Sequence, residues 1–177
     1  LEAAVSLGAA PIFNFGTNEQ KETYLPELLA GTKLWAFGLT EPDAGSDAGG
    51  TKTRAELEDG SWVINGSKQF ITNSGTDITA GVTITALTAK SAGARGEISA
   101  IMVPQGTKGY TVEKSYRKLG WHSSDTHPLT FAACNVPEAN LLGRRGRGSP
   151  QVPHTPPGGR GFRLSRSGAP AGGGSAL

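Results

Sequence analysis

This sequence of 177 residues has few of the features that cross-link a chain or anchor it in a membrane. Its one cysteine, Cys134, excludes an internal disulfide, and its cysteine and histidines show no metal-ligand spacing. No apolar run approaches the roughly 18–20 residues of a transmembrane helix. The N-terminus also lacks a basic-then-apolar secretory pattern. We therefore expect a protein of a reducing compartment, with Cys134 buried and inert and with no membrane span.

Acidic residues are missing from the end of the chain. Residues 144–177 hold six of the 17 basic residues, all arginine, which leaves 11 basic and 15 acidic residues (net charge −4) in residues 1–143. Four prolines between residues 150 and 157 exclude a helix there, and glycine, serine and arginine dominate from Gly161 onward. We expect this tail to be disordered. Nucleic-acid binding by a basic tail is the less favoured alternative.

The first part of the chain has a helical pattern. Residues 1–10 resemble the end of a helix that is broken at Pro11. A second helix is expected over residues 19–29, with Asn18 as its N-cap. Pro26 lies inside this second helix, so a bend or a later start at Pro26 is also compatible with the sequence.

From Leu34 the apolar pattern changes to a period of two, which is typical of strands. Strands are expected at residues 35–39, 53–58, 61–65, 67–72, 78–88, 98–103, 110–115 and 129–133. Asp59-Gly60 and Asn65-Gly66 are strong hairpin signals, because both turn positions need a positive φ. The fold class predicted is mainly β, an antiparallel barrel or sandwich preceded by two helices.

One strand ends in a loop that is rich in turn-forming and small polar residues, the run FGLTEPDAGSD at residues 37–47. Pro42 fixes its own φ, and Gly45 lets a ligand approach the backbone closely. Thr40 and Ser46 add hydroxyl groups. This loop can cradle the polar edge or the diphosphate of a cofactor, with an ordinary strand-to-turn connection as the alternative.

The order of residues 38–47, followed by two further glycines, resembles the signature of the acyl-CoA dehydrogenases, FAD enzymes that oxidise the α,β bond of acyl-CoA thioesters. Residues 68–73 (KQFITN) resemble the second flavin-contacting segment of that family. Other matching segments are Val63–Gly66, Gly109–Val112, Lys118–Trp121 and Val136–Gly143. The resemblance runs from about Leu1 to Gly148.

The resemblance implies a domain organisation. Residues 1–33 would be the end of the N-terminal helical domain, and residues 34–143 the middle β-domain. Residues 144–177 would stand where the family has a C-terminal helical domain, which is absent or corrupted here. The full family fold is α+β, with helical domains flanking the β-domain.

By the same resemblance, the first segment would meet FAD. Phe37, Leu39 and Thr40 would line the flavin ring system, with Thr40 donating a hydrogen bond to its pyrimidine edge. Ser46 would contact the FAD diphosphate and lie near the acyl-CoA substrate.

The second segment would cover the other side of the flavin through Phe70, Ile71 and Thr72. The Thr72 hydroxyl would lie near the flavin N5, which accepts hydride. Packing of Phe37 and Phe70 in the core is the alternative that the residues alone leave open.

No residue of this chain is predicted to be catalytic. Glu41, Asp43 and Asp47 are expected to cap backbone N–H groups in turns and to stay solvated. The family's catalytic carboxylate would come from the C-terminal helical domain.

Two further groups of polar residues are interpreted as structural. His122 and His127 frame a Ser/Asp-containing loop that lacks the context of a hydrolase triad, so a structural or interface role is expected. Lys108, Lys114, Arg117 and Lys118 could attract CoA phosphates, but a solvated basic face is favoured.

The resemblance implies a parent enzyme that oxidises acyl-CoA to trans-2-enoyl-CoA, transfers hydride to FAD and passes electrons to an electron-transfer flavoprotein. An acyl-CoA oxidase and an inactive FAD-binding fragment are the alternatives. A homo-oligomer (dimer or tetramer) is expected, without metal or nucleic acid, in the bacterial cytoplasm or the mitochondrial matrix.

Overall fold

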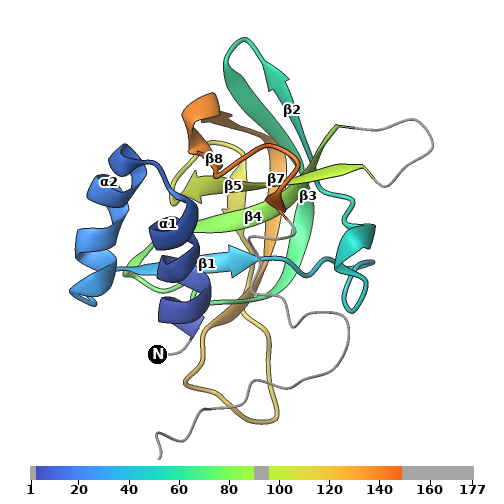
Figure 1. Ribbon diagram of the computed structural model, residues 1–177. Coiled ribbons are helices and arrows are strands. Elements are labelled where there is room, and N and C mark those ends of the chain that lie inside the picture. The colour runs from blue at the N-terminus through green and yellow to red at the C-terminus, as the bar shows by residue number, and fades with distance from the viewer. Residues whose placement is uncertain (1–2, 90–95, 149–177) are drawn as a thin grey trace, which may run out of the picture.

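In the computed structural model, which describes residues 3–89 and 96–148, helices pack beside one large sheet (Figure 1). The helical segments are a π-helix η1 (Ala3–Ala9), α1 (Ala10–Phe15), α2 (Asn18–Leu29) and two short 3₁₀ turns, η2 (Ala48–Gly50) and η3 (Glu138–Asn140). The strands are β1 (Leu34–Gly38), β2 (Arg54–Glu58), β3 (Ser61–Thr72), β4 (Thr79–Ala89), β5 (Glu97–Pro104), β6 (Tyr110–Val112), β7 (Thr126–Pro137) and β8 (Leu141–Leu142). The predicted class, mainly β after two helices, is confirmed.

The helices differ from the predictions at their ends. Pro11 does not end the first helical segment: the chain passes directly from the π-helix η1 into α1, and Pro11 lies at the second position of α1. The N-cap of α2 is Thr17 rather than Asn18. Its hydroxyl accepts from the Gln20 N–H at 3.2 Å, and the Gln20 side chain accepts from the Thr17 N–H at 3.0 Å. The helix continues through Pro26 to Leu29.

The strands form one open path in the order β6-β7-β3-β2-β4-β5-β8, and β1 branches from it by pairing with β4. Most neighbours are antiparallel, but β1 runs parallel to β4, and β2 meets β4 in parallel at one position. The path does not close into a barrel. The strand expected at 129–133 is longer, because β7 pairs along most of β3, and the one expected at 110–115 ends at Val112.

The hairpin predicted at Asn65-Gly66 is wrong, whereas the Asp59-Gly60 turn between β2 and β3 is confirmed. β3 runs through Gly66, which has a φ of 149° at a register shift in the pairing with β7. A Cβ at Gly66 would lie 2.7 Å from the Thr53 Cα. Glycine therefore permits a bulge and a close backbone approach rather than a chain reversal.

Two apolar clusters hold this arrangement together, one within the sheet and one between the helices and the sheet. Trp35 of β1 is fully buried in the second cluster, where its ring lies 4.8 Å from that of Tyr24 and its Nε1–H donates to the Thr83 hydroxyl at 2.9 Å. Cys134 is buried as expected, and burial raises the pKa of its thiol to about 11.

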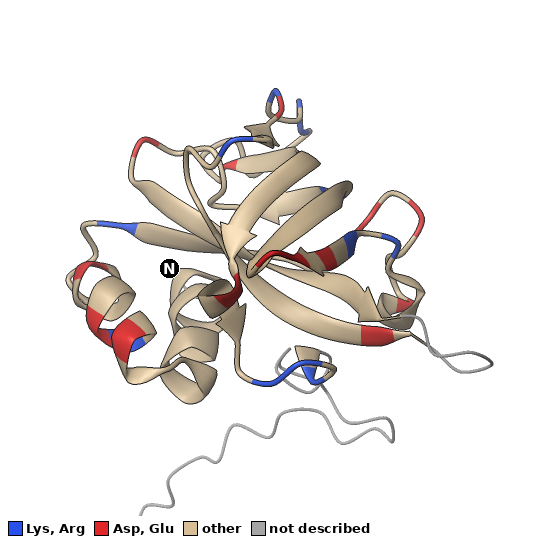
Figure 2. Ribbon diagram, turned by 90° about the horizontal axis from the view of Figure 1, so that it is seen from above, with Lys and Arg blue, Asp and Glu red and all other residues tan. Residues whose placement is uncertain are grey.

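Acidic and basic residues lie on α2, on some of the strands and in the loops that the structure describes, whereas η1, α1, β1 and β4 carry none (Figure 2). The start of the arginine-rich tail, residues 144–148, contacts the sheet. Arg145 donates to the Thr88 carbonyl at 2.6 Å, and its guanidinium lies 5.5 Å from the Trp62 ring. The tail expected to be disordered lies, from residue 149 on, outside the described residues. None of the described helices has the length and apolar character needed to cross a membrane.

Candidate functional site

The two segments singled out in the sequence line one pocket of about 220 Å³. The end of β1 and the residues after it form one wall, the end of β3 forms another, and η1 lies beside them. The lining residues are Ala3, Leu7, Phe37, Leu39, Thr40, Phe70, Ile71 and Thr72. Six of the seven predicted site residues therefore meet here. The seventh, Ser46, is exposed in the following loop and is not among the lining residues.

Backbone contacts bring the two walls together. The Gln69 N–H of β3 donates to the Thr40 carbonyl at 2.8 Å, immediately after β1. Gly38 lets these strands pack closely, because a Cβ there would lie 3.1 Å from Ile84 and 3.3 Å from the Lys68 side chain. The walls of the pocket thus belong to one hydrogen-bonded unit.

Phe70 is turned outward by an unusual backbone conformation. Its φ is 58°, at a register shift between Lys68 and Ile71 in the pairing of β3 with β7. The side chain is 60% exposed and its ring centroid lies 5.0 Å from that of Tyr116. Core packing therefore does not explain Phe70. A positive φ at an aromatic residue costs about 1–3 kcal/mol, and such strain gathers at functional sites.

The pocket offers two hydroxyl groups among apolar side chains. Within residues 3–89 and 96–148, the side chains of Thr40 and Thr72 have no hydrogen-bond partner. Phe37 and Leu39 are half-buried beside them, and Ile71 is buried. Apolar walls with a few polar groups suit a flat aromatic ligand that has a polar edge.

Behind this pocket lies a buried ion pair that sequence reasoning missed. The Lys68 Nζ lies 2.7 Å from a Glu41 carboxylate oxygen, and the two side chains are 0% and 3% exposed. The same ammonium group is 3.2 Å from the Leu39 carbonyl, 3.3 Å from the Thr51 hydroxyl and 3.2 Å from the Thr85 hydroxyl. Of the residues that supply these oxygens, Leu39 also lines the pocket.

Glu41 was expected to be a solvated cap, and this is wrong in one respect. It does accept from backbone N–H groups, that of Lys52 at 2.6 Å and that of Thr53 at 3.1 Å. It is nevertheless buried, since Lys68 and the segment from Thr51 to Thr53 surround its carboxylate. Asp47 follows the expectation, since it is exposed and accepts from the Gly49 N–H at 3.2 Å. Asp43 is exposed as expected, but it pairs with the Lys52 ammonium group at 2.8 Å instead of capping a backbone N–H.

Both members of the buried pair are charged at neutral pH. Burial raises the pKa of Glu41, but the Lys68 charge and the hydrogen bonds from Lys68, Thr51 and Lys52 outweigh it and hold the pKa at about 2. Burial lowers the pKa of Lys68 to about 8, and the Glu41 charge opposes that change.

We expect acid to weaken the fold through Glu41. Its pKa falls from 4.5 to about 2 on folding, so the native state binds fewer protons than the unfolded state between these values. This contribution to the free energy of unfolding, about 3 kcal/mol, is complete above pH 4.5 and is lost as the pH falls toward 2. Urea unfolding at pH 6 and pH 3 measures the larger part of this loss, about 2 kcal/mol. The double variant Glu41→Gln/Lys68→Met serves as the control, and an equal loss in both proteins would contradict the prediction.

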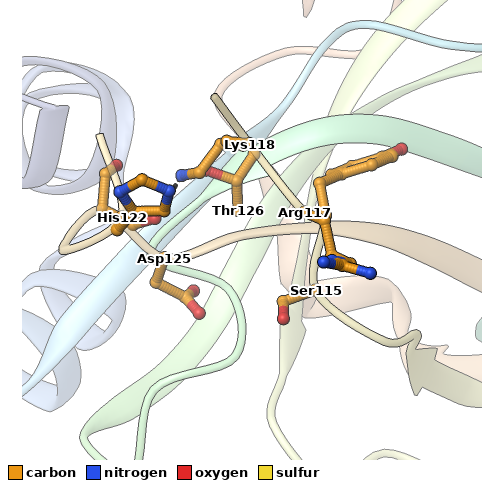
Figure 3. Close-up of a pocket in the computed structure, with 8 residues that line it drawn as sticks. Ser115, Arg117, Lys118, His122, Asp125 and Thr126 are labelled. Carbon is orange, nitrogen blue, oxygen red and sulfur yellow. Dashed lines mark hydrogen bonds between the residues drawn. The ribbon is translucent and has the colours of Figure 1, made fainter. Parts of the chain in front are cut away.

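The histidine-containing loop forms a second pocket of about 460 Å³ (Figure 3). Lys118 donates to the Thr126 hydroxyl at 2.9 Å at one end of it. Both ring nitrogens of His127 are engaged, one 2.6 Å from Asp125 and the other 2.6 Å from the Glu113 carbonyl. No serine hydroxyl contacts this imidazole within the described chain, so the structural interpretation fits better than a triad. Nor do the described residues hold a cluster of metal-ligating side chains.

Comparison with known proteins gives this architecture a family. Residues 36–134 match the acyl-CoA dehydrogenase middle domain, and residues 1–32 match the acyl-CoA dehydrogenase N-terminal domain. The short-chain specific acyl-CoA dehydrogenase of Megasphaera elsdenii is 48% identical over 162 residues, which is 90% of this chain and 41% of that protein.

Two solved structures are similar as well. Butyryl-CoA dehydrogenase from Megasphaera elsdenii matches 85% of this chain and 39% of its own with a TM-score of 0.79 and 45% identity. An acyl-CoA dehydrogenase complexed with FAD from Bacillus anthracis matches 85% of this chain and 25% of its own with a TM-score of 0.77 and 38% identity.

The chain thus shares its fold, an open and mostly antiparallel sheet that follows two helices, with these acyl-CoA dehydrogenases. The chain belongs to the acyl-CoA dehydrogenase family. It spans about two fifths of the length of the curated relatives it matches, 41% for that of Megasphaera elsdenii.

Proposed function

We propose that this chain forms the flavin-facing β-domain of an FAD-dependent dehydrogenase that oxidises acyl-CoA to trans-2-enoyl-CoA. The observation that carries the proposal is the single pocket formed by Phe37, Leu39 and Thr40 with Phe70–Thr72. These residues lie in two separate segments of the sequence, and the fold brings them together.

The side chains that line this pocket suit a flavin, because they combine an apolar surface with two hydroxyl groups. Phe37, Leu39 and Ile71 would hold the ring system on an apolar surface, with Phe70, whose ring makes a tilted contact with that of Tyr116, at its edge. The unpartnered hydroxyls of Thr40 and Thr72 would bind its polar edge. FAD, when bound, supplies the acceptor for the substrate's hydride. Ser46, exposed after the β1 loop, would reach the diphosphate and the acyl-CoA.

The proposal assigns no base to the described residues, because no carboxylate lines the pocket. Abstraction of the α-proton would come from another part of the parent enzyme. By the family resemblance we further propose an electron-transfer flavoprotein as electron acceptor and a homo-oligomeric parent, located in the bacterial cytoplasm or the mitochondrial matrix.

FAD binding by the 177-residue chain tests this proposal. We expect saturable quenching of FAD fluorescence, and a dissociation constant about three- to tenfold higher in Thr40→Val and in Thr72→Val, since each loses one hydrogen bond at constant shape. Thr111→Val, on the exposed face of β6, serves as the control and should bind as wild type. Absence of saturable binding, or equal binding by all four proteins, would refute the proposal.

A further inference from the structure

We propose that the buried Lys68–Glu41 pair is a positioning device that fixes Thr40 against the Phe70–Thr72 wall of the pocket. This inference rests on the proposed function where it concerns flavin, and on the geometry alone where it concerns the pocket wall. It gives a role to two charged side chains that never reach the pocket themselves.

The contacts of Lys68 lie on both sides of Thr40. Its ammonium group reaches the carbonyl of Leu39, the residue before, at 3.2 Å, and the carboxylate of Glu41, the residue after, at 2.7 Å. Thr40 is therefore held between two anchored neighbours. The Gln69 N–H, which follows Lys68 directly, then binds the Thr40 carbonyl itself at 2.8 Å.

The second wall begins two residues after Lys68, on the same strand. Along a regular strand Lys68 and Phe70 would point to one face, since side chains alternate. Here Lys68 is fully buried and Phe70 is 60% exposed, because the positive φ at Phe70 breaks the alternation. This short stretch of β3 thus places the Lys68 ammonium group inward, against the residues that follow β1, and the Phe70 ring outward, at the pocket.

Glu41 extends this anchoring into the sheet. Its carboxylate accepts from the Thr51 hydroxyl at 2.5 Å and from the Thr53 N–H at 3.1 Å. The Thr53 carbonyl in turn accepts from the Leu87 N–H of β4 at 2.8 Å. The loop after β1 is consequently tied to β4, although it has left the regular strand.

A charged pair provides this geometry where an apolar pair would not. Replacing buried ion pairs by apolar residues of similar size often leaves stability unchanged, so stability alone does not account for one. A methionine at position 68 fills the same volume but cannot hydrogen-bond the Leu39 carbonyl. What the ion pair adds is a defined separation between the two walls.

The test compares two paired variants of the full chain. Glu41→Gln/Lys68→Met removes the buried pair without leaving a lone charge, and Asp43→Asn/Lys52→Met removes the exposed pair of the same loop, whose side chains are 65% and 68% exposed. Amide hydrogen exchange at Gln69 reports on the link to Thr40. FAD titration and the visible absorption band of bound FAD report on the pocket.

For the buried-pair variant we expect exchange at Gln69 and the FAD dissociation constant each to rise about tenfold, with a changed FAD band. The exposed-pair variant should stay within about twofold of wild type. Wild-type exchange at Gln69 in a folded buried-pair variant would overturn the inference. If wild type binds no FAD, the proposed function fails, and exchange at Gln69 alone decides the positioning role.

A milder variant covers the case in which the buried-pair variant does not fold. Thr51→Val removes one hydroxyl that donates to Glu41 and lies 3.3 Å from the Lys68 Nζ, and it keeps the side-chain shape. Exchange at Gln69 should then rise about threefold. Exchange equal to wild type in this variant would also overturn the inference.

Discussion

Lys68→Met alone is expected to destabilise the fold by about 3–5 kcal/mol, a large effect for a single polar substitution. Methionine fills the space of the lysine stem, so little cavity remains. What remains is the Glu41 carboxylate, 3% exposed and without its counter-charge. Urea unfolding at pH 7, followed by fluorescence of the buried Trp35 and Trp62, measures the loss.

The double variant separates charge from packing. Glu41→Gln added to Lys68→Met removes the uncompensated charge, so we expect the free energy of unfolding to recover to within about 1–2 kcal/mol of wild type. If the double variant were as unstable as Lys68→Met, loss of packing would be the cause and the electrostatic explanation would fail.

Trp35→Ala is expected to cost a similarly large amount, about 3–5 kcal/mol. The indole is fully buried between α2 and the sheet, against Tyr24. Gly81 gives it room, because a Cβ there would lie 2.6 Å from the ring. Its removal leaves a cavity between the Gly81 backbone and the Tyr24 ring, and it leaves the Thr83 hydroxyl without its donor.

Trp35→Phe is the matched control, because it keeps an aromatic ring and loses only the N–H donor and part of the volume. We expect it to cost about 1–2 kcal/mol, close to the value of one buried hydrogen bond. Thermal unfolding by circular dichroism compares the two. A loss below about 1 kcal/mol for Trp35→Ala would show that this cluster does not join the helices to the sheet.

Local sequence signals predicted the fold well where the structure depends only on neighbouring residues. The Asp59-Gly60 turn needs only two positive φ angles between neighbouring strands, and both are present. The Asn65-Gly66 signal is equally strong locally but gives a bulge, because β3 has partners on both sides, β2 and β7. Long-range pairing overrode the turn there, and nothing within a few residues of Gly66 indicates that.

The candidate site likewise has a part that the sequence predicts and a part that it does not. Six of its lining residues follow from the order of two short segments, which can be read along the chain, whereas Ala3 and Leu7 of η1 were not predicted. The ion pair behind them could not be identified, because it joins Glu41 and Lys68 across two elements. One faint signal exists: alternation from the buried Trp62 and Ile64 places position 68 on the inward face, where a lysine needs a buried partner. The positive φ at Phe70 has no sequence signal that we can name.

The parallel pairing of β1 with β4 also has a consequence for how the chain folds. Within residues 3–89 and 96–148, β4 is the one strand that pairs with β1, and the register joins Leu34 to Thr79 and Gly38 to Ile84. During synthesis β1 therefore cannot pair until β4 has left the ribosome. Closing so long a loop carries an entropic cost that local hairpins avoid, and contacts of this kind form late. We infer that the β2–β3 hairpin assembles first and that the pocket is among the last parts of the domain to mature.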